Sequence, residues 1–208
     1  MDTSKEYNLA VETCRQVFTK KTIDYGTAWR ILRPLSVTDQ IYIKAQRIRT
    51  LEENETNVID DNIFDEFIGI VNYGIIGIIQ MTEYEVNPIN LPIKEANDRY
   101  DEIIEFAKDL MYLKNTDYGE AWRSMRISSF TDLILMKLFR TKQIEDNNGK
   151  TLISEGIEAN YYDMINYAIF ALIRLQENNE KRNQLQKPQI KQYTWKNKIK
   201  IRKNGLSN

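Results

Sequence analysis

The sequence of 208 residues contains no histidine and a single cysteine, Cys14. Without histidine, the protein cannot use a Ser-His-Asp or Cys-His catalytic group, a histidine proton shuttle or a histidine-rich metal site. One cysteine excludes an intrachain disulfide and a zinc site built from cysteines. Because Cys14 lies in an amphipathic helical pattern, we expect it to be a buried, apolar side chain rather than a reactive thiol.

Glycine and proline are also scarce, with 8 and 4 residues. So few turn-forming residues in a chain of this length favour a helical protein. The most apolar run, residues 67–79, is shorter than the roughly 20 residues that span a bilayer, and it contains Asn72. We therefore expect a buried core helix there and no membrane association. The charged N-terminus does not resemble a signal peptide, which predicts a cytoplasmic protein.

Charge is unevenly distributed along the chain. Residues 176–208 hold nine Lys and Arg against two Asp and Glu, a net charge of +7, and since the whole chain carries −1, the first 175 residues carry −8. Within this tail, basic residues alternate over residues 195–202 with Trp195, Asn197, Ile199 and Ile201. This period of two predicts an edge strand, or an arm that extends against an anion, so nucleic acid is a partner to consider.

The chain repeats a phrase: DYGTAWRILR at residues 24–33 and DYGEAWRSMR at residues 117–126. Over residues 24–54 and 117–147, aligned without a gap, 15 of 31 positions are identical. Two copies are too few for a solenoid, so we interpret the pattern as a duplicated unit packed about a pseudo-two-fold axis.

Each copy has the pattern of three helices, which predicts an all-α fold: a tandem duplication of a three-helix unit in one helical body, plus a basic C-terminal tail. We expect copy one at residues 1–84, a proline-containing linker at 85–94, copy two at 95–176 and the tail at 177–208. Capping-box patterns at Ser36 and Ser129 predict the starts of the second helices. The third helices are expected at Ile63–Thr82 and Ile157–Gln176.

Eight cations occupy equivalent places in the two copies. Ordinary surface charge has no reason to stay in place through a duplication, so two hypotheses remain open. The cations form internal ion pairs with the repeated carboxylates, or they bind phosphate, for which arginine is well suited. The residues are Arg30, Arg33, Lys44 and Arg47 in copy one, and Arg123, Arg126, Lys137 and Arg140 in copy two.

Repeated aromatic and amide residues form the second group of candidates. The tryptophans either anchor the loop on the helices or stack on a base, and the tyrosine hydroxyls need polar partners. An asparagine in each apolar third helix needs hydrogen-bond partners if it is buried. These residues are Tyr25, Trp29 and Asn72 in copy one, and Tyr118, Trp122 and Asn166 in copy two.

Carboxylates are the candidates for catalysis. Asp163 lies one turn before Asn166, whereas copy one has Gly69 at the aligned place. Any carboxylate-dependent chemistry is therefore asymmetric, and copy two is favoured as the active half. We predict Mg²⁺ held by Asp163, Glu155 and Glu158, with Asp163 and Asp117 as the catalytic residues that orient a water molecule.

The pattern K-x-x-DYG-x-AW-R-x-x-R, followed by S-x-TD-x-I-x-x-K-x-x-R and by NY on an apolar helix, resembles the nucleotide-modification-associated domain family of bacteria and phages. The family is in turn distantly similar to the all-α nucleoside triphosphate pyrophosphohydrolases of the MazG type. Those enzymes hold Mg²⁺ with E-x-x-E on one helix and E-x-x-D on the next. Here Asp163 falls at the last position of that pattern, but Asn160 replaces its partner Glu, and Lys137 and Arg140 stand where E-x-x-E is expected.

Together these features predict a nucleotide-binding domain. Its most concrete form is a Mg²⁺-dependent pyrophosphohydrolase in which the copy-two cations hold the phosphates and Tyr118 or Trp122 stacks on the base. A non-catalytic nucleotide or nucleic-acid binding module and a helical interaction scaffold are the alternatives. The sequence leaves a homo-oligomer open.

Overall fold

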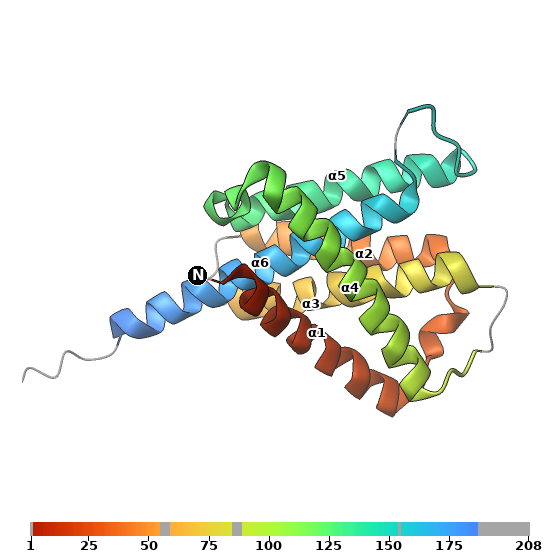
Figure 1. Cartoon of the computed structure of the whole chain (residues 1–208), viewed down its shortest axis with the longest axis horizontal. Coiled ribbons are helices and arrows are strands. Elements are labelled where there is room, and N and C mark those ends of the chain that lie inside the picture. The colour runs from red at the N-terminus through yellow and green to blue at the C-terminus, as the bar shows by residue number, and fades with distance from the viewer. Residues whose placement is uncertain (1, 55–58, 85–88, 154, 187–208) are drawn as a thin grey trace, which may run out of the picture. The chain divides into compact units, whose positions relative to one another are not determined.

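All regular structure in the described part of the chain is helical (Figure 1). The computed structural model describes residues 2–54, 59–84, 89–153 and 155–186. Copy one consists of α1 (Thr3–Tyr25), the short 3-10 helix η1 (Ala28–Ile31), α2 (Pro34–Glu53) and α3 (Ile59–Glu83). Copy two repeats this order with α4 (Ile93–Tyr118), η2 (Ala121–Ser124), α5 (Ile127–Asp146) and α6 (Ile157–Gln186). The prediction of an all-α tandem duplication is confirmed.

The chain divides into two units, residues Met1–Gln176 and Glu177–Asn208. The helix predicted to end at Gln176 continues to Gln186, because residues 177–186 contain neither proline nor glycine to stop it. The alternating pattern at residues 195–202 lies outside the described residues.

The apolar helix α3 lies in the protein core. By length and composition its segment Ile63–Glu83 could cross a membrane, but 78% of the most apolar window is buried inside the protein, as is typical of a core helix. Two glycines bring α3 and α6 close together. A Cβ atom on Gly74 would lie 2.6 Å from the Ile165 side chain, and one on Gly77 would lie 2.0 Å from the Tyr161 ring.

A reciprocal pair of buried hydrogen bonds joins the two copies. The hydroxyl of Tyr7 in copy one donates to the amide oxygen of Asn166 in copy two at 2.8 Å, and Tyr100 in copy two donates to Asn72 in copy one at 3.1 Å. Each amide also donates to a backbone carbonyl of the first helix of its own copy, at 2.9 and 3.1 Å. The expected partners of the buried asparagines are therefore present, and each copy completes the other.

The same reciprocity relates α2 and α5, which pack against each other. Thr38 donates to Glu145 at 2.6 Å, and its equivalent Thr131 donates to Glu52 at 3.1 Å. Two equivalent ion pairs also join the copies at the exposed edge of this contact. They link Lys142 to Asp39 and Arg49 to Asp132. These contacts indicate that the pseudo-two-fold axis passes between α2 and α5.

The capping-box prediction for these two helices is wrong. α2 begins at Pro34 and α5 at Ile127, so the serines lie inside the first turn. Arg33 and Arg126 occupy the N-cap positions with extended backbone and no side-chain cap. Pro34 at the first helical position fixes φ for a helix start and has no N–H to satisfy.

Candidate functional site

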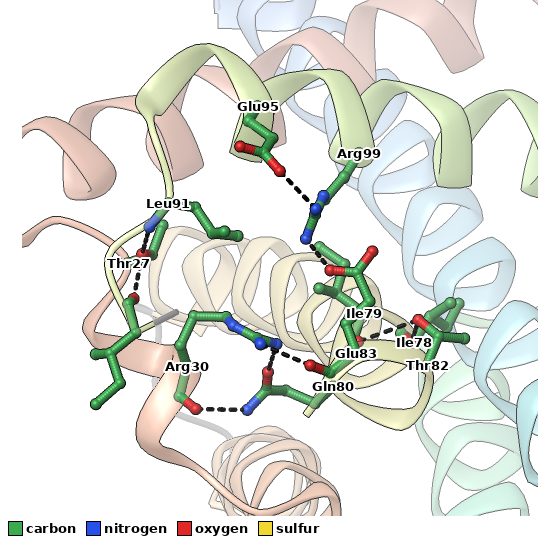
Figure 2. Close-up of polar contacts among 11 residues, drawn as sticks. Thr27, Arg30, Ile78, Ile79, Gln80, Thr82, Glu83, Leu91, Glu95 and Arg99 are labelled. Carbon is green, nitrogen blue, oxygen red and sulfur yellow. Dashed lines mark hydrogen bonds and ion pairs between the residues drawn. The ribbon is translucent and has the colours of Figure 1, made fainter. Parts of the chain in front are cut away.

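Arg30 is a structural residue rather than a phosphate ligand. Only 3% of it is exposed. Figure 2 shows its guanidinium directed at α3, where it donates to the side chain of Gln80 and to the backbone carbonyl of Glu83, the latter at 2.7 Å. The Gln80 amide donates back to the carbonyl of Arg30 at 3.0 Å. These contacts fix the η1 turn on α3.

Its equivalent in copy two, Arg123, has different partners. The residue aligned with Gln80 is Arg174, which cannot accept a hydrogen bond from a guanidinium. Arg123 instead forms ion pairs with Glu6 and Glu120, and its guanidinium lies 4.3 Å from the centroid of the Trp122 ring. The internal ion-pair hypothesis therefore describes Arg123, with carboxylates that the repeat did not indicate.

The paired cations of α2 contact Glu66 on α3. The ammonium of Lys44 lies 3.1 Å from one carboxylate oxygen of Glu66, and the Arg47 guanidinium lies 3.0 Å from the other. The Glu66 side chain is 10% exposed, whereas that of Arg47 is 60% exposed. Sequence reasoning missed Glu66, although its place on α3, three residues before Gly69, is the signal that would have found it.

In copy two the equivalent lysine pairs with Asp163. The Lys137 ammonium lies 2.6 Å from an Asp163 oxygen, and both side chains are less than a tenth exposed. Lys114 on α4 contacts the other oxygen. Two ammonium groups thus neutralise the carboxylate predicted to hold Mg²⁺, and no three acidic side chains converge among the residues that the structure describes.

The third helix carries its carboxylate at a different aligned position in each copy. Copy one has Glu66 and Gly69, where copy two has Asn160 and Asp163. In both copies the same lysine of the second helix binds whichever carboxylate is present. In copy one, a Cβ atom on Gly69 would lie 2.5 Å from Cε of Lys44, so the Lys44 side chain packs against the place that Asp163 takes in copy two.

The remaining candidates lie on the surface. Tyr25 and Tyr118 are 70% and 77% exposed, and Arg33 and Arg126 are exposed without an ion pair to any described residue. Asp117, Glu155 and Glu158 are exposed, and Arg140 is partly exposed. Lys137 contacts Asp163 and Arg123 contacts Trp122, but the structure does not bring these pairs and the other copy-two candidates together into one site.

Copy one contains a pocket of about 780 Å³. α1, η1, α2 and α3 form its walls, and its lining is more apolar than polar. Aromatic rings are prominent in it, together with two lysines and two carboxylates: Phe18, Tyr25, Trp29, Tyr73, Lys21, Lys44, Asp65 and Glu66. The volume is within the range of small-molecule sites.

The equivalent space in copy two is filled. Trp122 is 5% exposed and stacks on Phe170, with ring centroids 4.4 Å apart and an interplanar angle of 7°. In copy one the residue aligned with Phe170 is Ile76, which lines the pocket beside Trp29. A smaller pocket of about 350 Å³ lies in copy two, where Arg140 lines it. That copy two is the active half stays a prediction.

The fold and pocket define a class: an all-α protein with a duplicated three-helix unit and a small-molecule-sized pocket in copy one. The family described as Nucleotide modification associated domain 1 matches residues 21–81 and 114–175, more than half of the chain, so the chain belongs to this family. This match confirms the resemblance seen in the repeated motif. No curated protein and no solved structure matches the chain significantly, so the similarity to MazG-type enzymes stays a prediction.

Proposed function

We propose that this protein binds a nucleotide-type ligand in the copy-one pocket. The observation that carries the proposal is the pocket itself, with aromatic residues and lysine in a cavity of about 780 Å³. Aromatic rings stack on any base and contribute about 1–3 kcal/mol per base in nucleic-acid sites. The family description, which concerns nucleotide modification, supports the same ligand class.

Binding is a better proposal than Mg²⁺-assisted hydrolysis. A catalytic metal site needs carboxylate oxygens that are open to the ion. Asp163 is held by two lysines, and Glu66 is held by Lys44 and Arg47. A metal ion would have to displace these ammonium and guanidinium groups from nearly buried carboxylates.

Substituting copy-two residues into the copy-one pocket tests whether this pocket binds the ligand. The double variant Gly69→Asp, Ile76→Phe places the residues of copy two at two lining positions of copy one. At Gly69 a Cβ atom would lie 2.5 Å from Cε of Lys44, the end of a flexible side chain that can shift. Because Asp163 and Phe170 occupy these two positions in copy two, we expect the variant to fold and its pocket to be filled.

Calorimetric titration with a panel of ribo- and deoxyribonucleotides, with and without Mg²⁺, measures binding. We expect a ligand that binds the wild type and loses at least tenfold in affinity in the double variant. Phe170→Ile, the reverse change in copy two, is the matched control and should leave the affinity unchanged. Equal binding to the wild type and to the filled variant, with circular dichroism showing both folded, would remove the pocket from the proposal.

A further inference from the structure

The charge of the pocket limits how many phosphates its ligand carries. Four charged side chains line it, and their formal charges cancel: Lys21 and Lys44 are positive, and Asp65 and Glu66 are negative. Sites that bind nucleoside triphosphates meet several negative charges with a surplus of cations or a metal ion. This pocket has no such surplus.

The inner charged pair is already satisfied. Glu66 is 8% exposed and pairs with Lys44 at 3.1 Å and with Arg47 at 3.0 Å. If Lys44 moved to a phosphate, the nearly buried carboxylate would lose a partner, which is costly in a site of low polarity. Lys44 is therefore a poor phosphate ligand.

The exposed rim offers one cation. Lys21 on α1 is exposed and forms no ion pair with any described residue. Tyr25 lies one turn further along the same helix and is 70% exposed. Asp65, also exposed, lines the same pocket from α3 and repels a second or third phosphate.

The inner wall suits an uncharged ring. Phe18 and Ile68 are 3% and 5% exposed, and Trp29 and Tyr73 are partly buried. A base can occupy this part of the pocket while its sugar stays near the rim. One phosphate then reaches Lys21, and any further phosphates extend into water.

We infer that the pocket receives a nucleoside with no more than one phosphate, and that it does not select triphosphates. This inference rests on the proposed nucleotide-binding function. It places the ligand among nucleosides and nucleoside monophosphates, the compounds that phosphate-removing reactions release and that kinases consume.

The test is calorimetric titration of the full chain with the four deoxyribonucleosides, their 5′-monophosphates and their 5′-triphosphates, each at 50 and 200 mM KCl. For the base that binds best, we expect the monophosphate to bind up to about tenfold more tightly than the nucleoside. We expect the triphosphate to bind no more tightly than the monophosphate. Lys21→Gln should remove the advantage of the monophosphate and leave the nucleoside affinity within twofold.

Two results would overturn the inference, and they are distinguishable. If the triphosphate binds more than tenfold more tightly than the monophosphate, with an affinity that falls steeply between 50 and 200 mM KCl, the ligand class is wrong and the proposed nucleotide binding stands. If no nucleoside or nucleotide binds the folded protein, the proposed function fails and the inference fails with it.

Discussion

Replacing Asp163 by asparagine decides whether this carboxylate is structural or catalytic. The ammonium of Lys137 lies 2.6 Å from Asp163, and the two side chains are 8% and 9% exposed. Removing one partner of a buried ion pair costs about 3–5 kcal/mol, because the other charge stays buried. The asparagine oxygen still accepts a hydrogen bond, so we expect Asp163→Asn to lower the free energy of unfolding by about 3 kcal/mol. In a chain of this size the melting temperature should fall by roughly 6–12 °C.

The matched control is Glu66→Gln in copy one. Glu66 is also nearly buried, but its partners reach water, with the side chains of Lys44 and Arg47 25% and 60% exposed. A cation that remains in contact with water after losing its partner destabilises the fold little. We therefore expect Glu66→Gln to lower the free energy of unfolding by about 1–2 kcal/mol. Urea denaturation at pH 7, followed by circular dichroism, gives both values.

Two outcomes would refute this reasoning. The first is a loss for Asp163→Asn no larger than that for Glu66→Gln. The second is a rise in the melting temperature of the wild type on adding Mg²⁺ that disappears in Asp163→Asn, since a ligand that binds only the folded state stabilises it. The second result would restore Asp163 as a metal ligand.

Three further predictions concern stability. Tyr7→Phe leaves the buried amide oxygen of Asn166 without its tyrosine donor, so urea denaturation should show a loss of about 1–3 kcal/mol; a loss below 0.5 kcal/mol would contradict this. Burial raises the pKa of Glu145, so its carboxylate is disfavoured in the fold as the pH rises above its unfolded-state pKa. Glu145→Gln should therefore melt at a higher temperature than the wild type at pH 7, and the difference should disappear at about pH 3, where Glu145 is protonated in both the folded and the unfolded chain; an equal difference at both pH values would refute the assignment. Arg30→Met should cost about 1–3 kcal/mol by leaving buried acceptors on α3 unpaired, whereas Arg33→Ala on the surface should stay within about 0.5 kcal/mol; equal losses in thermal denaturation would show that Arg30 is not the anchor.

The fold could be predicted from the sequence because the duplication shows each element twice. Helical patterns in the two copies predicted the six α-helices that the described residues form, and the burial of Cys14 and Asn72 followed from their places in apolar helical patterns. Gly26 and Gly119 have φ of 63° and 61° at the ends of α1 and α4, the conformation that a repeated glycine indicates. The starts of α2 and α5 were predicted wrongly, because Ser36 and Ser129 match the capping-box pattern, yet both helices begin two residues earlier with Arg33 and Arg126 as N-caps.

The site could be predicted only in part, because the partners of a charge depend on tertiary packing. The repeated lysines were recognised, but their carboxylates lie at different positions in the two copies, Glu66 in one and Asp163 in the other. When the copies are compared position by position, Asp163 aligns with Gly69 and therefore looks like a carboxylate that only copy two has. This comparison favoured copy two for catalysis. Gly69 and Ile76 line the copy-one pocket where copy two has Asp163 and Phe170, and only the fold shows that Trp29 belongs to the same lining.

The duplication also explains how the two copies can differ at the place where copy one has its pocket and copy two has the stacked rings of Trp122 and Phe170. Contacts on the pseudo-two-fold axis require both copies, since Tyr7 and Tyr100 each complete an amide in the other half. These residues cannot diverge independently without leaving buried polar groups unpaired. Asn72 of these contacts also lines the copy-one pocket. Trp122 and Phe170, which stack on each other in copy two, take no part in these hydrogen bonds, so this part of the unit is free to differ between the copies. Stacked, buried aromatic rings stabilise the fold, and the open pocket of copy one leaves its own aromatic residues available to a ligand. The binding role that we propose for copy one is therefore compatible with a duplicated unit whose halves share the contacts on the pseudo-two-fold axis and differ in the packing beside Trp29 and Trp122.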